Sequence, residues 1–385
     1  MKIESMEVMV LADPKPYDAN APVEPLAVLT IRTTDGVHGI SEVFAVPAAV
    51  ARSALEGAES FFGAMLIGRS FDTPVEMWRY VYGRLAHRSR RGWAMICLGA
   101  IDICAWDIYG KLLSQPIYKL LGGKERASAQ TWSAEQRTSV IPYGTVFSGN
   151  RARDVLVPTQ LGMVERLCDH GYRAIKIEPV ESTPETVVHL TKEARKLCGD
   201  NVALAVDVGY LWTDTGMAVD VARRLEEYDI IFLETPFSTD ALHAYDNLSK
   251  KTPLRLAAGE HSVTRFEFHD LVERGGCSVV QPYVTTCGGF TEARRIVEYC
   301  LDRGVIVCPG NWSTQLLGAA SVHLAAYSEI TPYIEFTPAE AYASPLRQAI
   351  QDIAHPVVNG AIALPTKPGL GIELPPDLVK TYRIA

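Results

Sequence analysis

The chain has 385 residues, 48% of them hydrophobic and 21% charged, which is typical of a globular protein. This length exceeds one typical domain and fits a barrel of about 250 residues with a smaller companion domain. The 37 basic and 45 acidic residues give a net charge of −8, and the longest basic stretch is the short HRSRRGW at 87–93. This balance disfavours nucleic acid as a partner and favours a small molecule.

The cysteines and the apolar stretches bear on the compartment. The eight cysteines contain no C-x-x-C pair, and several lie in apolar runs such as GVIVCP, so we expect buried free thiols. Free thiols fit a reducing cytosol, which predicts a cytoplasmic protein. The N-terminal MKIESMEVMVLADPKP has no apolar core of signal-peptide length, and no apolar stretch reaches about 18 residues. We therefore expect no contact with a membrane.

The N-terminal third predicts a small α+β domain over residues 1–125. Residues 1–45 alternate apolar and polar side chains, typical of antiparallel strands, with Asp35-Gly36 as a hairpin turn. The segment 13–25 between these strands has four prolines and is predicted to be an irregular loop. Residues 48–121 read as helices, and 94–113 are apolar on nearly every face, which indicates a buried helix.

After Gly122-Gly123 the pattern changes to short β-rich runs that alternate with helices. There are eight runs: IPYGTVFS, RAIKIEP, VALAVDV, IIFLE, LRLAAGE, SVVQPY, GVIVCPG and YIEF. They predict a (β/α)₈ barrel over 126–340, a fold whose active sites lie at the C-terminal ends of the strands. The turn-rich residues 341–385 are expected to return to the first domain.

Three acids end three successive runs of this barrel. Asp207, Glu234 and Glu260 are spaced by 27 (234 − 207) and 26 (260 − 234) residues, about one β/α unit each. Each could cap the helix that follows it, but three in register predict carboxylates that converge at one end of the barrel. Such clustering is unfavourable unless a cation binds, and an all-oxygen site suits Mg²⁺.

Motifs along the whole chain resemble the enolase superfamily, in the branch of mandelate racemase, muconate lactonizing enzyme and the acid-sugar dehydratases. The resemblance rests on TDGVHGISE, AIDICAWDIYGKLLSQPIYKLLGG, GYRAIKIE, VDV, LETP, AGE, QPYVTTCGGFTEARR, VCPGNW and PTKPGLG, in this order. It implies that Asp207, Glu234 and Glu260 bind Mg²⁺. It also implies removal of the proton α to a substrate carboxylate, with an enediolate as the intermediate.

The chain departs from this branch at its usual bases. Where the branch carries Lys-x-Lys on the second barrel strand, this chain has Lys176-Ile177-Glu178. Where the branch often carries a histidine and an aspartate on the opposite face, this chain has Gly310 and Tyr283. Racemisation with a base on each face is therefore disfavoured. The base is expected to be Glu178 with Lys176 steering charge, or Lys176 with Glu178 as proton partner; a structural ion pair is the alternative.

Further residues are candidates for contact with the substrate. Tyr283, Asn311 and Trp312 could assist a leaving group or bind substrate on the second face, although Tyr283 could equally fill space. His261 follows Glu260, and Glu335 resembles an acid that in this branch binds the substrate carboxylate when protonated; packing and helix capping are their alternatives. The remaining candidates are Arg88, with Arg90 and Arg91, in a basic stretch that could equally be surface, and Tyr17 in a specificity lid at 13–25.

These features predict a Mg²⁺-dependent lyase that dehydrates a sugar acid or another hydroxy acid, because β-elimination needs a single competent base. An isomerase, meaning an epimerase, racemase or cycloisomerase, is the nearest alternative. A metal-binding barrel without catalysis is the alternative from another class. The expected partner is a small-molecule carboxylate, and we expect an assembly of identical subunits.

Overall fold

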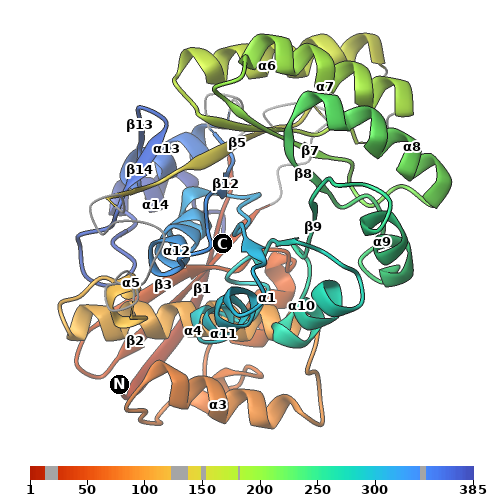
Figure 1. Ribbon diagram of the computed structural model, residues 1–385. Coiled ribbons are helices and arrows are strands. Elements are labelled where there is room, and N and C mark those ends of the chain that lie inside the picture. The colour runs from red at the N-terminus through yellow and green to blue at the C-terminus, as the bar shows by residue number, and fades with distance from the viewer. Residues whose placement is uncertain (14–24, 123–137, 149–152, 181–182, 339–343) are drawn as a thin grey trace.

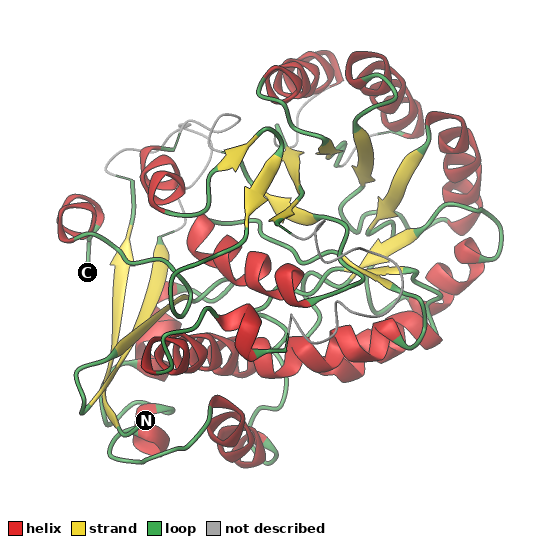
Figure 2. Cartoon of the chain, turned by 60° about the vertical axis from the view of Figure 1, so that its left-hand side comes forward, coloured by secondary structure: helices red, strands yellow, loops and turns green. Residues whose placement is uncertain are grey.

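The computed structural model describes residues 1–13, 25–122, 138–148, 153–180, 183–338 and 344–385 (Figure 1). It contains an eight-stranded parallel sheet and two small antiparallel sheets of three strands each. The predicted combination of a barrel with an N-terminal α+β capping domain is confirmed. Figure 2 shows helices around the outside of the curled sheet.

The capping domain begins with an antiparallel meander. Its elements are β1 (Ile3–Leu11), β2 (Leu26–Thr33), β3 (His38–Glu42), α1 (Ala48–Leu55), α2 (Gly63–Leu66), α3 (Pro74–Leu85), α4 (Trp93–Leu112) and α5 (Ile117–Leu120). The turn between β2 and β3 uses Gly36 at φ 79°, as the Asp-Gly pair predicted. Helix α4 packs tightly on β3, since a Cβ added at Gly39 would lie 2.1 Å from the carbonyl oxygen of Cys104. Glycine is therefore needed at position 39 for this close approach.

Helix α4 is the central helix of the capping domain. It is long and apolar enough to cross a membrane by length and composition, but 89% of its apolar window is buried inside the fold. It carries Asp102 and Asp107, both with exposed fractions of 0%, which bind other parts of the chain. The all-round apolar character thus reflects a core position, as the sequence predicted.

The barrel strands follow in sequence order around the sheet, apart from the last. They are β5 (Pro142–Val146), β6 (Ala174–Ile177), β7 (Ala203–Asp207), β8 (Ile230–Glu234), β9 (Leu256–Ala258), β10 (Val279–Val280), β11 (Ile306–Val307) and β12 (Ile334–Phe336). Strand β12 pairs with β5, and the Glu335 N–H donates to the Pro309 carbonyl at 2.9 Å. This bond connects the two ends of the strand order, β11 and β12, so the sheet curls toward closure.

Helices cover the outside of the sheet. They are α6 (Arg153–Asp169), α7 (Pro184–Cys198), α8 (Thr215–Leu225), η2 (Glu226–Tyr228), α9 (Leu242–Ser249), α10 (Thr264–Glu273), α11 (Phe290–Leu301), α12 (Gln315–Tyr327) and α13 (Pro345–Ile353). Helices α6 to α12 connect consecutive barrel strands, whose pairs are all parallel, so the eight strands point the same way and their C-terminal ends share one rim.

The C-terminal residues contact both parts of the molecule. Strands β13 (Val357–Val358) and β14 (Ala361–Ala363) pair with β4 (Ser139–Val140) beside the barrel, and α14 (Pro376–Tyr382) follows. The Ile384 N–H donates to the Val10 carbonyl at 2.9 Å, and Lys111 forms an ion pair with Glu373 at 2.5 Å. These contacts support the predicted return to the capping domain, while the domain boundaries themselves remain a prediction.

Helix α4 also fixes the capping domain to the barrel, beside α11 (Figure 1). The Asp102 carboxylate accepts from the Thr291 N–H at 2.9 Å and from the Thr291 hydroxyl at 2.7 Å, in the first turn of α11. The Trp78 indole donates to the Gly288 carbonyl at 2.7 Å. Buried polar groups that are fully bonded specify one arrangement, so the cap has a defined position over the barrel.

Candidate active site

The three acids that the spacing singled out lie on one rim of the barrel. Asp207 and Glu234 are the last residues of β7 and β8 and are direct neighbours in the strand register. Glu260 follows β9 by two residues. Asp207 and Glu234 have exposed fractions of 6% and 1%. Three carboxylates thus lie at a site that is largely shielded from water, where their mutual repulsion is strong.

The ammonium of Lys176 lies among these acids. Its Nζ is 2.9 Å from Glu234 Oε1, 2.9 Å from Glu335 Oε1 and 3.2 Å from Asp207 Oδ2, with an exposed fraction of 1%. Burial opposes the charge, but the surrounding carboxylates, led by Glu234, raise the pKa of Lys176 well above its usual value. In this arrangement Lys176 is a cation that holds the acids together, which disfavours it as the base.

Glu178 lies just beyond β6 on the same face as Lys176, with Oε1 3.5 Å from the ammonium. Burial, with the charges of Asp207 and Glu335, raises the pKa of Glu178 well above its usual value despite Lys176. The side chain of Gln160, from α6, bonds the Glu178 backbone on both sides, at 3.1 Å to the N–H and 2.6 Å to the carbonyl. A fixed carboxyl that readily takes up a proton has the properties of a general base.

Glu335, on β12, is surrounded by hydrogen-bond donors. Its oxygens accept from the Thr145 hydroxyl at 2.9 Å, the Tyr283 hydroxyl at 2.7 Å and the Asn311 N–H at 2.8 Å, besides Lys176. Burial raises the pKa of Glu335, but Lys176 and these donors outweigh burial, and the net effect is a lowered pKa. In this arrangement four donors stabilise the anion, and the contact of a protonated Glu335 with a substrate carboxylate remains a prediction. None of these four donors belongs to a helix N-terminus, so they give no support to the alternative of a helix cap.

Tyr283 fills the second face of the site. A Cβ added at Gly310 would lie 1.8 Å from Tyr283 Cε2, so the ring occupies the space above the glycine. The Tyr283 hydroxyl also lies 3.4 Å from Glu260 Oε2, besides its bond to Glu335. Tyr283 therefore fills space and donates its hydroxyl proton to Glu335, with Glu260 nearby, while its contact with a substrate or leaving group remains a prediction.

An aromatic side chain from the capping domain covers this tyrosine. Phe44, just after β3, stacks on Tyr283 with ring centroids 5.1 Å apart and planes 15° apart. Nothing in the sequence pattern singled out Phe44, because it belongs to neither a strand nor a helix. The capping domain thus supplies part of the wall on the second face.

The loop after β11 carries Asn311 and Trp312. Asn311 is fully buried, and its Oδ1 has no hydrogen-bond partner among the described residues. Trp312 packs edge-on against Phe147 at 5.6 Å between ring centroids. The loop is held by the buried carboxylate of Glu42, which accepts from the hydroxyls of Ser313 and Thr314. A capping-domain acid thus fixes the loop beside the predicted second face.

His261 lies at the exposed edge of the site. Its side chain is 58% exposed, its Nε2 is 3.6 Å from Glu260 Oε1, and its ring stacks on Tyr210 at 5.8 Å. The Tyr210 hydroxyl donates to the same carboxylate oxygen of Glu260. Sequence reasoning missed Tyr210, which lies in the loop after β7 with φ 68°.

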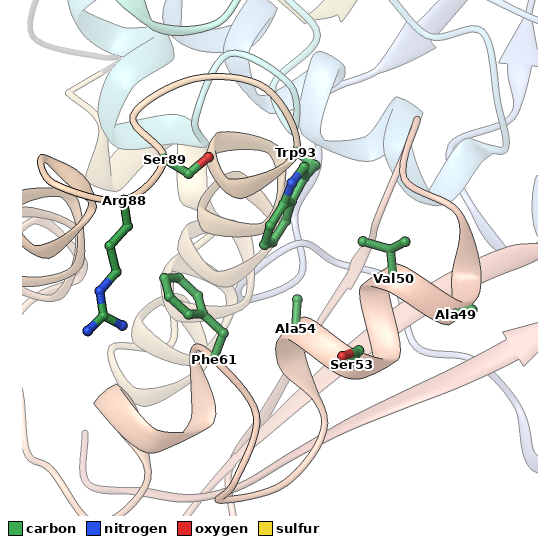
Figure 3. A pocket seen from close by; sticks show the side chains of 8 residues that line it. All are labelled: Ala49, Val50, Ser53, Ala54, Phe61, Arg88, Ser89 and Trp93. Carbon is green, nitrogen blue, oxygen red and sulfur yellow. The ribbon is translucent and has the colours of Figure 1, made fainter.

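Arg88 lies between α3 and α4 in the capping domain. Its guanidinium is 5.6 Å from the centre of the Phe61 ring, in a capping-domain pocket bordered by α1 and Trp93 (Figure 3). The described residues that line this pocket all belong to the capping domain. The neighbouring Arg91 does reach the barrel, where it forms an ion pair with Glu267 on α10. Tyr17 and most of the predicted lid lie outside the described residues.

The acids fit a divalent cation by their chemistry. Within the described residues no three His, Cys, Asp or Glu side chains are arranged as a ready metal site, and the Lys176 ammonium lies between several of the acids. However, Glu234 Oε2 is buried and has no hydrogen-bond partner among the residues that the structure describes. Burial and the charge of Asp207 raise the pKa of Glu234 well above its usual value. An all-oxygen set with an unpartnered carboxylate oxygen suits Mg²⁺.

Comparison with known proteins agrees with this geometry. Residues 162–378 match the family model described as enolase C-terminal domain-like, and residues 10–122 match that of the mandelate racemase/muconate lactonizing enzyme N-terminal domain. D-galactarolactone cycloisomerase of Agrobacterium fabrum is 28% identical over 331 residues, covering 84% of this chain and 83% of that protein. Arabinonate dehydratase of Saccharolobus solfataricus is 26% identical over 365 residues, covering 95% and 92%.

A solved structure shares the fold over its full length. A racemase from Streptomyces coelicolor A3(2) with bound magnesium superposes with a TM-score of 0.82 at 23% identity, covering 99% of this chain and 100% of that one. The family matches span both parts of the molecule, so the predicted superfamily is confirmed. The chain belongs to the enolase superfamily, in the family of mandelate racemase and muconate lactonizing enzyme, whose members similar to it include dehydratases and cycloisomerases.

Proposed function

We propose that this protein is a Mg²⁺-dependent dehydratase of a sugar acid or a related hydroxy acid. The observation that carries the proposal is the single dry cluster in which Glu178 and Lys176 face Asp207, Glu234 and Glu335. A bound Mg²⁺, held by Asp207, Glu234 and Glu260, would supply the positive charge that offsets a substrate carboxylate as it gains negative charge. The named relatives act on sugar-derived acids or lactones, which supports this class of substrate.

Glu178 is proposed as the base that takes the proton from the carbon α to the carboxylate. It is buried, Gln160 fixes its backbone, and Lys176 offsets its charge when it is ionised. Lys176 orients charge and does not act as the base, because carboxylates surround its ammonium. A positioned base of this kind contributes about 10²–10⁴-fold to the rate.

Tyr283 is proposed to give a proton to the departing β-hydroxyl, which leaves as water. Its hydroxyl lies between Glu335 and Glu260, and burial together with these acids raises the pKa of Tyr283, so the phenol carries the proton before the reaction begins. Gly310 offers no second base opposite Glu178. Elimination needs one base and one acid, whereas racemisation needs a proton-transferring group on each face.

A cycloisomerase is the second candidate, and the A. fabrum relative of that name favours it. In that reaction a hydroxyl or lactone oxygen of the substrate is the group that adds or leaves, and Tyr283 could serve it in the same way. We further propose a cytoplasmic enzyme made of identical subunits, in keeping with the free thiols.

The test is a panel of sugar acids and their lactones, incubated with protein and Mg²⁺ in D₂O and followed by proton NMR. We expect a keto-deoxy acid from at least one substrate. Exchange of the α proton or ring closure without loss of water would instead establish an isomerase. If no substrate in the panel reacts while the protein still binds Mg²⁺, the result would support a metal-binding barrel without catalysis and contradict our proposal.

A further inference from the structure

Two cysteines on neighbouring barrel helices are in contact. Cys168 lies in the last turn of α6, and Cys198 is the last residue of α7, with 3.9 Å between the two sulfur atoms. The two helices lie side by side on the outside of the barrel (Figure 1). Among the described residues, which include all eight cysteines, this is the one thiol–thiol contact.

The surroundings of the two thiols differ in a way that suits exchange with a small disulfide. Cys168 is partly exposed, and its hydrogen bond with Cys198 lowers the pKa of the Cys168 thiol. Cys198 is buried, with an exposed fraction of 8%. The accessible thiol is therefore the one that more readily forms the thiolate, and the thiolate is the attacking species. The second thiol is already in contact with the sulfur that it would have to reach.

We propose that Cys168 and Cys198 are a redox-active dithiol, which a small organic disulfide such as oxidised glutathione converts into an intramolecular disulfide bond. The Cys168 thiolate attacks one sulfur of the small disulfide, forms a mixed disulfide and releases one thiol. Cys198 then gives up its proton and attacks the Cys168 sulfur, which releases the second thiol. Two protein thiols are oxidised and one small disulfide is reduced to two thiols. The sulfur atoms must approach from 3.9 Å to about 2.05 Å.

The position of this bond determines its effect. Residues 168 and 198 enclose β6, so the bond would close a ring that contains Lys176 and Glu178. Because α6 and α7 end where β6 and β7 begin, the bond lies at the rim opposite the acids. It would restrict the unfolded chain and leave the site untouched. In a reducing compartment the dithiol form prevails, and oxidation occurs when the pool of small disulfides rises.

The test uses the full-length protein, reduced, desalted and then incubated with oxidised glutathione without air. We expect free thiols to fall from eight to six (8 − 2) in a titration of the unfolded protein. Tryptic peptides 167–173 and 197–223 should appear joined, and dithiothreitol should separate them. The apparent melting temperature should rise by a few degrees. No variant is needed for this readout.

Variants assign the effect to the pair. Cys168→Ser and Cys198→Ser should each abolish the joined peptides and the rise in melting temperature, whereas Cys300→Ala, at a buried position of α11, should keep both. Eight thiols after oxidation, a lasting glutathione adduct on Cys168, or a disulfide that uses another cysteine would each overturn the proposal. The result does not depend on the proposed function, because every readout is independent of activity.

Discussion

The ring of Tyr283 occupies the space that any side chain at position 310 would need, since a Cβ at Gly310 would lie 1.8 Å from Tyr283 Cε2. The branch that this chain resembles often carries a histidine and an aspartate on this face. Here the space is filled by a phenol that hydrogen-bonds to Glu335 at 2.7 Å. This exchange is the structural reason for preferring elimination, or ring closure and opening, over two-base racemisation.

Gly310→Ala should displace the Tyr283 ring and reduce kcat by at least tenfold, because the methyl group cannot coexist with the ring in its place. Gly83→Ala in α3 is the matched control, since a Cβ there meets no atom within 4 Å, and it should leave kcat unchanged. Steady-state kinetics measures both. Unchanged kcat for Gly310→Ala would show that the position of Tyr283 is irrelevant to catalysis.

Phe44→Ala should remove the ring that the capping domain packs against Tyr283. The stacked pair with Tyr283 is worth about 0.5–1.5 kcal/mol, so we expect KM to rise several-fold and kcat to fall less than it does in Glu178→Gln. Phe61→Ala, in the pocket around Arg88, serves as the control and should leave KM unchanged. If both variants behaved alike, Phe44 would have no particular role in the site.

Lys176→Met should make the protein depend on Mg²⁺ for stability. Removing the ammonium leaves buried carboxylates without their cation, and breaking a buried pair in this way typically costs about 3–5 kcal/mol. We expect a lower melting temperature in EDTA than for the wild type, and a larger rise when Mg²⁺ is added. Lys196→Met, whose exposed side chain pairs with Glu193, is the control. An equal Mg²⁺ response in the two variants would argue against a cation among these acids.

Glu234→Gln should abolish Mg²⁺ binding measured by calorimetry, because Glu234 Oε2 is the buried, unpartnered oxygen of the set. The fold should persist, since amide and carboxylate have nearly the same shape. Far-ultraviolet circular dichroism checks this. Wild-type affinity for Mg²⁺ in this variant would refute the ligand assignment.

His323 should make the protein less stable in acid. The ring is fully buried on α12, where Nδ1 accepts from the Tyr118 N–H and Nε2 bonds the Leu370 carbonyl. Burial, with the nearby His355, lowers the pKa of His323 to about 3 from 6.5. In the unfolded chain, His323 binds a proton below about pH 6.5, whereas in the native state it stays neutral down to about pH 3. The free energy of unfolding therefore falls as the pH drops from about 6.5 to about 3.

Urea unfolding at pH 7 and pH 5 measures this effect. Each pKa unit corresponds to about 1.4 kcal/mol, so roughly 2 kcal/mol should be lost between these two pH values through His323. His323→Asn should lose less stability over the same interval, whereas His87→Asn, at an exposed position, should match the wild type. An identical pH dependence in all three proteins would contradict the account of His323.

The sequence predicted the parts of the site that follow from strand periodicity. Asp207 and Glu234 end neighbouring strands because β/α units repeat at a regular length, and Lys176 and Glu178 share a face because strand residues alternate. The sequence did not predict the roles of Phe44, Gln160 and Tyr210. Each contacts the site through tertiary packing, which no local sequence pattern indicates. Placing Arg88 likewise required the packing of α1 against the loop before α4.

Glu335 shows a second limit of sequence reasoning. It was expected to close the eighth strand, and the structure shows it buried as the middle residue of β12. Its charge could not be predicted, because the pKa depends on the position of the Lys176 ammonium and on donors from three other elements. Protonation is set by the assembled environment and not by residue type.

The most direct test of the account is the rate of α-proton loss in Glu178→Gln. With a substrate identified by the NMR panel, and with Mg²⁺ present, the variant should lose about 10²–10⁴-fold in this rate, because the positioned base is gone. Glu193→Gln, on the surface of α7, should retain the wild-type rate. Proton loss in Glu178→Gln at the wild-type rate would mean that the base is another residue, and the proposed mechanism would be wrong even though the fold is right.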